Sequence, residues 1–241
     1  NPRGAIFSRI FFAQQSTTNF AAVSTGGTNN IYFYVVVNGT TYSLATTATL
    51  TQNTWTHVAA RWTASTLSPQ VFFNGVLQAG AAGGTSSTCT SGLMTLGTRP
   101  GGFQYFNGGI DEARLWNEAR TDCEIQSNYN RSITGVQVNL TANYDFNQGV
   151  AGGNNAGVTT LPDLSGNAYN GTLTNFTLNG VGSNWITSNA VVTSQGNPAG
   201  GYISSMSAAV CSGGSLTFPD DSSQTNITAP TTQVSTIPGP G

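Results

Sequence analysis

Oxygen-bearing side chains recur at every second position of one short segment in the second half of the chain. Asp163, Ser165 and Asn167 alternate with Leu164 and Gly166. A hard cation such as Ca²⁺ takes about six to eight oxygen ligands, and loops often supply them from alternate positions. The pattern therefore predicts a calcium site, provided that a further carboxylate joins it. An Asx turn, in which the Asp163 carboxylate binds nearby backbone N–H groups, explains the same residues without a metal.

Asp111 is the carboxylate that we expect to complete that site. It lies two residues before Ala113 and four before Leu115, and such side chains share one face of a strand. If Ala113 and Leu115 face the core, Asp111 does so too, and a buried carboxylate needs a partner. That partner is a bound cation in one interpretation, and Arg114 or Arg99 in the other.

A second segment with the sequence GGFQYFN alternates aromatic rings with amides. Sugars bind to the faces of aromatic rings and to the amide and hydroxyl groups around them. We therefore expect a carbohydrate site at Phe103, Tyr105 and Asn107, with an exposed ring as the stacking platform. The alternative is that these rings are core residues of a hairpin. Tyr169 and Trp185 are further aromatic candidates.

The composition excludes several classes of partner. Only 7% of the 241 residues are charged, the seven basic residues are all arginines, and the net charge is −2. Scattered arginines form neither the basic stripe of a nucleic-acid-binding protein nor a polybasic membrane patch. No apolar run reaches the roughly 18 residues of a transmembrane helix. We therefore expect a protein that is secreted or on the outer cell surface, and that binds no nucleic acid.

The three cysteines, Cys89, Cys123 and Cys211, lie far apart, so they form no Cys-x-x-Cys metal or redox motif. In an oxidising compartment, a Cys89–Cys123 disulfide would leave Cys211 for a partner elsewhere, and the pairing stays open. The chain begins with Asn1 rather than Met, so we expect a processed product or a fragment.

Short β-branched and aromatic runs separated by Gly, Asn, Ser and Thr predict an all-β sandwich. Asn-Gly pairs after Val37 and Phe73 predict two tight hairpins. In the segment 54–63, Val58, Ala60 and Trp62 fall on one face of a strand. One short helix is expected at 122–129, because Thr-x-x-Glu at 121–124 is a capping box.

Two segments then resemble the laminin G-like domains of the concanavalin A-like lectin/glucanase group. Residues 53–78 (NTWTHVAARWTASTLSPQVFFNGVLQ) resemble the central hairpin of that family, and residues 106–125 (FNGGIDEARLWNEARTDCEI) resemble its last strand and helix. The resemblance implies a jelly roll. The strands that should precede Ile6 are missing, and residues 140–186 resemble a segment that usually opens such a domain.

Enzymatic activity is not expected. The glucanases with this fold carry both catalytic carboxylates in a Glu-x-Asp-x-x-Glu pattern, which is absent here. Asp111 and Glu112 are adjacent, so on a strand they would point to opposite faces. The single histidine, His57, lies in a structural strand motif of the family, and nucleophile-elbow, zinc-protease and phosphate-loop motifs are absent.

The expected organisation is a jelly roll over residues 1–195, with 140–190 as a C-terminal β extension or a complement to its sheet. Residues 196–241 then form a linker and the start of a further β unit, with strands at 208–211 and 215–218. The resemblance implies a non-catalytic module of a bacterial surface adhesin that binds glycan. A structural spacer or filament subunit, which exchanges strands with neighbouring domains of the same long chain, is the alternative.

Overall fold

The computed structural model describes residues 8–16, 18–83, 94–100, 104–133, 135–180, 183–188 and 190, together with four two-residue strands between 205 and 238. The chain divides into two units, Asn1–Val192 and Thr193–Gly241. Within the described residues, both units contain β-strands, and the first also contains one short helix. The predicted all-β class with a single helix is confirmed.

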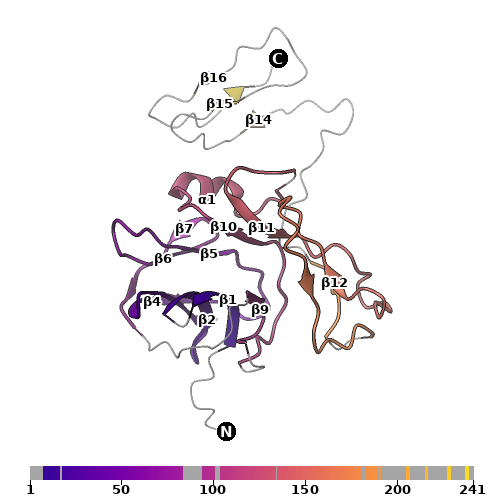
Figure 1. The fold of residues 1–241 in the computed structure, drawn as a ribbon. Coiled ribbons are helices and arrows are strands. Elements are labelled where there is room, and N and C mark those ends of the chain that lie inside the picture. The colour runs from indigo at the N-terminus through magenta and orange to yellow at the C-terminus, as the bar shows by residue number, and fades with distance from the viewer. Residues whose placement is uncertain are drawn as a thin grey trace. The chain divides into compact units, whose positions relative to one another are not determined.

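A six-stranded antiparallel sheet forms one layer of the first unit (Figure 1). Its order is β8-β4-β3-β2-β1-β9. The strands are β1 (Ser8–Ser16), β2 (Asn19–Thr25), β3 (Asn30–Val37), β4 (Thr40–Thr49), β8 (Gly80–Ala81) and β9 (Thr95–Leu96). The long meander from β1 to β4 follows from tight turns, which place consecutive strands side by side.

The second layer consists of two smaller sheets. One is β5-β6-β7, and the other pairs β10 with β11 in antiparallel fashion. A separate two-stranded sheet joins β12 to β13. The strands are β5 (Val58–Arg61), β6 (Gln70–Phe73), β7 (Val76–Leu77), β10 (Ala113–Trp116), β11 (Leu140–Tyr144), β12 (Thr160–Leu161) and β13 (Gly171–Thr172).

Both predicted Asn-Gly hairpins are confirmed. Asn38 and Gly39 connect β3 to β4 with φ of 49° and 79°, and Asn74 and Gly75 connect β6 to β7 with φ of 48° and 80°. Two consecutive residues with positive φ give the turn whose twist matches that of paired strands, and Asn and Gly tolerate it best. These turns therefore fix the register of both hairpins.

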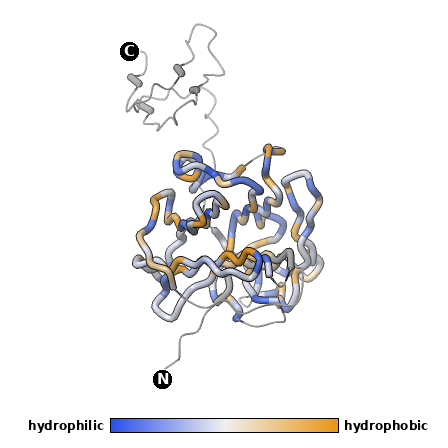
Figure 2. The backbone as a smooth tube through the Cα atoms, turned by 60° about the vertical axis from the view of Figure 1, so that its left-hand side comes forward, coloured by the Kyte–Doolittle hydropathy of each residue, from blue (hydrophilic) through white to orange (hydrophobic). Residues whose placement is uncertain are grey.

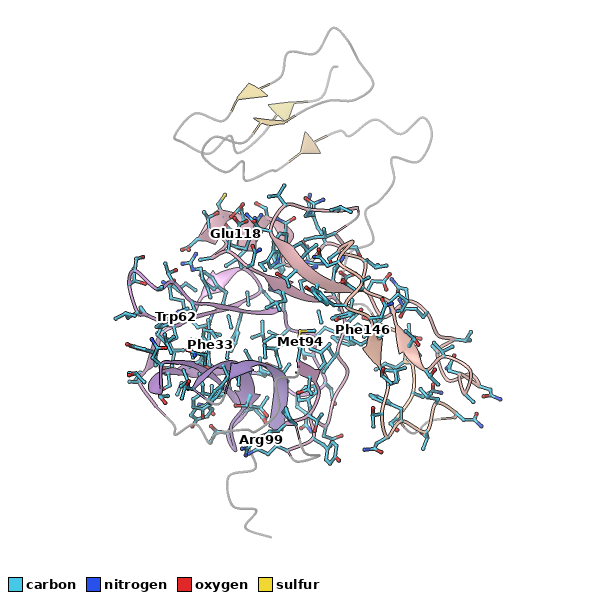
Figure 3. The ribbon with its side chains drawn as sticks, viewed as in Figure 1. Phe33, Trp62, Met94, Arg99, Glu118 and Phe146 are labelled. Carbon is cyan, nitrogen blue, oxygen red and sulfur yellow. The ribbon has the colours of Figure 1, made fainter. Side chains whose placement is uncertain are left out.

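The core lies between the two layers. Its buried centre, from β2, β3 and β6, comprises Val23, Ile31, Phe33, Val35 and Val71. Val58, Ala60 and Trp62, which the sequence places on one face of a strand, all pack against this centre. Figure 2 shows hydrophobic segments in the strands near the middle of the unit, separated by hydrophilic or neutral loops. In Figure 3, Phe33, Trp62 and Met94 lie in the space between the layers.

The helix α1 (Asp122–Asn128) begins at the predicted capping box. The Thr121 hydroxyl accepts a hydrogen bond from the Glu124 backbone N–H, and the Glu124 carboxylate accepts one from the Thr121 N–H. Such caps satisfy N–H groups that the first helical turn leaves without partners. Ile125 is the buried residue of the helix. A Cβ on Gly75 would lie 2.9 Å from the Gln126 Cα, so glycine lets α1 approach the β6–β7 turn.

A buried ion pair connects β10 to the chain around the end of the helix. The Arg114 guanidinium lies 2.6 Å from the Glu112 carboxylate, and the two side chains are only 9% and 8% exposed. Arg114 also donates to the Asn128 and Arg131 carbonyls, and the Ser132 hydroxyl donates to Glu112. The pair therefore holds the C-terminal end of α1 and the segment after it against β10.

The second unit is described only as two strand pairs. They are β14 (Ser205–Met206) with β17 (Ile237–Pro238), and β15 (Ser215–Leu216) with β16 (Ile227–Thr228). The strand expected at 215–218 is present in part as β15, whereas the one expected at 208–211 lies outside the described residues.

Replacing Glu112 by Gln should lower the free energy of unfolding by about 3 kcal/mol, because it leaves the buried Arg114 charge without its counter-ion. Urea denaturation followed by tryptophan fluorescence measures the change. The matched control is Glu118→Gln, which removes a carboxylate from the more exposed pair with Arg120 and should cost below about 1 kcal/mol. Equal losses in the two variants would contradict a special role for the buried pair.

Candidate functional site

The free edge of β11 determines the geometry of the loop at 163–170. β11 pairs with β10 along one edge, and the loop supplies hydrogen bonds along the other. The Asn143 N–H donates to the Asp163 Oδ1 at 2.9 Å, and the Leu164 N–H donates to the Asn143 carbonyl at 2.8 Å. Buried backbone groups need such partners. The loop therefore takes the place of a neighbouring strand.

Two more side chains continue this pattern toward the start of β11. The Ser165 hydroxyl, whose single proton is shared with the Asp163 carboxylate, lies 3.1 Å from the Thr141 carbonyl. The Asn167 Nδ2 donates to the carbonyls of Leu140 and Thr141, both at 3.0 Å. The structure thus brings together the three loop residues that the sequence singled out, but it aims them at backbone groups of a strand.

The Asp163 carboxylate accepts four hydrogen bonds from the protein. Its Oδ1 accepts from the backbone N–H groups of Asn143 and Ser165, and its Oδ2 accepts from the Ser165 hydroxyl and the Tyr169 N–H. Desolvation by burial acts to raise the pKa of this carboxyl, but these donors together outweigh it and hold the pKa below its ordinary value. Asp163 is therefore ionised near pH 7, and its carboxylate stabilises the loop through these hydrogen bonds.

In this arrangement, protein donors already occupy the positions that a calcium ion would use on Asp163. Each carboxylate oxygen has about two lone pairs, so four donors occupy the whole acceptor capacity of Asp163. Among the described residues, no three His, Cys, Asp or Glu side chains gather where they could hold a metal ion. A cation would have to displace the protein donors, and the calcium site at Asp163, Ser165 and Asn167 stays a prediction.

Asp111 lies apart from this hydrogen-bond network. Its Oδ2 accepts from the Ser188 hydroxyl at 2.5 Å, and its Oδ1 accepts from the Glu112 N–H at 2.9 Å. Arg114, one of the expected partners of Asp111, pairs with Glu112 instead. Glu112 has φ of 51°, so the backbone turns before β10 begins at Ala113. The alternation of the strand therefore does not extend back to Asp111.

The expected sugar-binding residues are only partly described. Tyr105 is 56% exposed and Asn107 is exposed, whereas Phe103 lies outside the described residues. Tyr105 is therefore not a core residue. Of the further aromatic candidates, Trp185 is half-buried and donates its indole N–H to the Phe146 carbonyl at 2.8 Å. Tyr169 is 58% exposed.

A hollow of about 280 Å³ has Tyr169 among the residues that line it. Four amide residues also line it, namely Asn117, Gln137, Asn139 and Asn167. The first three amides were not predicted from the sequence; Asn117 follows β10, whereas Gln137 and Asn139 lie in the connection from α1 to β11. The structure joins two of them, because the Asn117 N–H donates to the Asn139 carbonyl at 3.0 Å.

A second cavity, of about 620 Å³, lies between the two layers of the first unit. Its lining includes strand β5 from one sheet and strand β10 from the other, together with Phe33 from the facing sheet. Most of the residues that line it are apolar. It is thus an internal space of the sandwich, and its polar groups include His57 and the Glu112–Arg114 pair.

His57 is held just before β5 by the β6–β7 turn. Its backbone N–H donates to the Asn74 Oδ1 at 2.9 Å, and the Asn74 backbone N–H donates to the His57 carbonyl at 3.0 Å. The ring Nδ1 is buried and has no hydrogen-bond partner. Desolvation, with a smaller contribution from the Arg114 charge, lowers the pKa of the imidazole to about 4. His57 is therefore neutral near pH 7.

The Cys123 thiol is disulfide-bonded, and both other cysteines lie outside the described residues. The pairing with Cys89 or Cys211 stays a prediction. Among the described residues, no helix has the length and hydrophobicity that crossing a bilayer needs.

Asp163→Asn should lower the free energy of unfolding by about 2 kcal/mol at pH 7, because an amide offers one acceptor oxygen where the carboxylate offers two. A carboxyl whose pKa is lowered by folding stabilises above its unfolded pKa, and this contribution disappears as pH falls through the folded value. The difference between wild type and variant should therefore shrink below about pH 4. Urea titrations at pH 7 and pH 3 measure it, with exposed Asp122→Asn as the control. A constant difference at both pH values would contradict it.

Wild type should lose about 2 kcal/mol of stability between pH 7 and pH 5, since folding lowers the pKa of its single histidine from about 6.5 to about 4. The unfolded chain binds the proton more tightly in this window, so acid favours unfolding. His57→Phe retains a ring and removes the titration, and its stability should stay nearly level over the same range. Urea midpoints at half-unit pH intervals measure both curves. Parallel curves would contradict the assignment.

The comparisons with known proteins come from family models, curated sequences and solved structures. The model of the concanavalin A-like lectin/glucanases superfamily matches residues 3–126. No curated protein matches the chain at a significant level. A solved structure of a "putative carbohydrate binding protein" from Bacteroides ovatus ATCC 8483 is 20% identical with a TM-score of 0.51. The match covers 69% of this chain and 47% of that protein, so this chain corresponds to about half of its length.

A further solved structure is an S-layer domain-containing protein, residues 221–444, from Clostridium thermocellum ATCC 27405. It is 18% identical with a TM-score of 0.23, and the match covers 50% of this chain and 61% of that one. The family match spans more than half of the chain and covers β1 to β10 and most of α1, whereas β11 lies beyond it. The chain therefore belongs to the concanavalin A-like lectin/glucanases superfamily.

Proposed function

We propose that the chain is a non-catalytic, carbohydrate-binding module of an exported bacterial surface protein of the adhesin type. The observation that carries this proposal is the exposure of two tyrosine rings, Tyr105 at 56% and Tyr169 at 58%. Each lies on a loop of the β scaffold close in sequence to amide side chains. Exposed aromatic rings beside amides and hydroxyls supply stacking and hydrogen bonds to an uncharged, hydroxyl-rich ligand.

The carboxylates favour binding over hydrolysis. A glycosidase needs one carboxyl group to protonate the leaving group and a second to attack or to activate water. The seven carboxylates of the described residues all have hydrogen-bond or ion-pair partners within the protein. Glu112 is committed to the buried pair with Arg114, and Asp163 is committed to the edge of β11. These contacts give the carboxylates structural roles.

Export is supported by the Cys123 disulfide, because disulfides persist mainly outside the reducing cytosol. The low proportion of charged side chains fits a surface that is solvated by hydroxyls and amides. The structural neighbour from Bacteroides ovatus, whose description includes carbohydrate binding, adds a relative of the same fold. Fold alone does not determine ligand, so the proposal rests on the exposed rings.

A second candidate function is structural, and the open edges of β5 and β10 favour it. Among the described strands, β5 pairs with β6 and β10 pairs with β11, and residues of both strands line the same inter-sheet cavity. A strand donated by a neighbouring domain could hydrogen-bond to these edges and fill part of the cavity. The module would then serve as a spacer or filament subunit.

The 241-residue chain should be retarded in native gels that contain at least one neutral polysaccharide from a panel of dextran, mannan, laminarin and xylan. We expect the same retardation with Ca²⁺ and with EDTA, because the protein itself occupies the acceptor positions of Asp163. Loss of binding in EDTA would instead support the predicted calcium site. A folded chain that binds no glycan and forms larger species with concentration in size exclusion would replace carbohydrate binding by the structural function.

A further inference from the structure

We propose that the hollow beside Tyr169 is the carbohydrate site of this module and that its ligand is a neutral saccharide. The inference rests on the proposed function and assigns it to one place. The hollow measures about 280 Å³, close to the lower end of the range of small-molecule pockets, roughly 300 Å³. This volume suits one or two sugar rings at the end or side of a glycan.

The charge of the lining selects the class of sugar. None of the described residues that line the hollow is acidic or basic, whereas amides and hydroxyls predominate. An amide both donates and accepts hydrogen bonds, as a sugar hydroxyl does. A uronic acid or a sulfated sugar would have to bury its charge against groups that cannot neutralise it. The lining therefore favours neutral hexoses or pentoses.

Tyr169 is an exposed ring on a backbone that is held on both sides. Its N–H donates to the Asp163 Oδ2 at 2.9 Å, and its carbonyl accepts from the Tyr144 hydroxyl at 2.5 Å. Burial, followed by the Asp163 charge, raises the pKa of that hydroxyl, which keeps it protonated as a donor. An aromatic face that is fixed before binding loses little entropy when a ligand stacks on it.

Three amides around the ring are placed by contacts that leave binding capacity. Asn167 uses its Nδ2 for the carbonyls of β11, and Asn139 uses its Nδ2 for the Glu118 carboxylate at 2.6 Å. Within the described part of the chain, no side-chain hydrogen bond involves the Oδ1 of either residue or the amide of Asn117. These groups can therefore accept from sugar hydroxyls, and Asn117 can also donate to them.

Tyr105 provides a matched comparison within the same chain. Its ring is as exposed as that of Tyr169, at 56% against 58%, but Tyr105 and Asn107 do not line the hollow. Exposure alone thus does not show which of the two rings binds sugar. The amide residues that line the hollow with Tyr169 favour that ring, because stacking holds only one face of a sugar and hydrogen bonds must hold its edge.

Isothermal titration of the 241-residue chain with each polysaccharide of the panel, and with alginate as a polyuronate, tests the inference. Wild type should bind a neutral polysaccharide and not alginate. Tyr169→Ala should weaken that binding at least tenfold and Asn117→Ala should weaken it severalfold, whereas Phe176→Ala, which removes an exposed ring that does not line the hollow, should bind as wild type does. Melting temperatures near that of wild type should accompany all three, because the replaced side chains are exposed.

Three results would overturn the inference while leaving carbohydrate binding intact. They are unchanged binding by folded Tyr169→Ala, loss of binding in Phe176→Ala alone, and preferential binding of alginate by wild type. The failure of wild type to bind any polysaccharide would reject the proposed function itself. The variants therefore test the location of the site, and wild type tests its existence.

Discussion

The structure depends on a simple constraint at the edge of β11, where each backbone N–H and C=O must find a hydrogen bond without a neighbouring strand. The loop at 163–170 meets this need with side chains and with its own backbone. Asp163 is the central group, because one carboxylate binds both the Asn143 N–H of β11 and the Tyr169 N–H of the loop. The position of the Tyr169 ring thus follows from how a strand edge is satisfied.

In the second layer of the sandwich, strand edges also need hydrogen-bond partners. Among the described strands, β5 pairs with β6 and β10 pairs with β11, and residues of both strands line one cavity of about 620 Å³. Side chains supply contacts that connect these two strands to the rest of the unit. The Arg61 guanidinium donates to the Arg120 carbonyl at 2.7 Å, and the buried Arg114–Glu112 pair holds the end of α1. In a chain with only 7% charged residues, the charges are concentrated at these joints.

The proposed binding surface makes use of the groups that remain. With the described carboxylates and with Arg61, Arg114 and Arg120 engaged in the scaffold, amides, hydroxyls and exposed aromatic rings are available to contact a ligand. Such groups suit a neutral ligand that is rich in hydroxyls, and they exclude strong electrostatic steering. Preorganisation of the loop, rather than charge, then supplies affinity, because a fixed ring and fixed amides lose little entropy on binding.

The sequence by itself determined the elements whose signals are local. The Asn-Gly turns, the shared face of Val58, Ala60 and Trp62, and the capping box at Thr121 all depend on residues close together in the chain, and the family resemblance supplied the fold. The roles of the Asp163, Ser165 and Asn167 side chains were decided by tertiary structure. Alternate spacing serves a calcium loop and the edge of a strand equally well, because backbone groups along a strand also repeat every second residue. Only the position of β11 beside the loop distinguishes the two, just as only the folding of distant segments brings Asn117 and Asn139 to Tyr169.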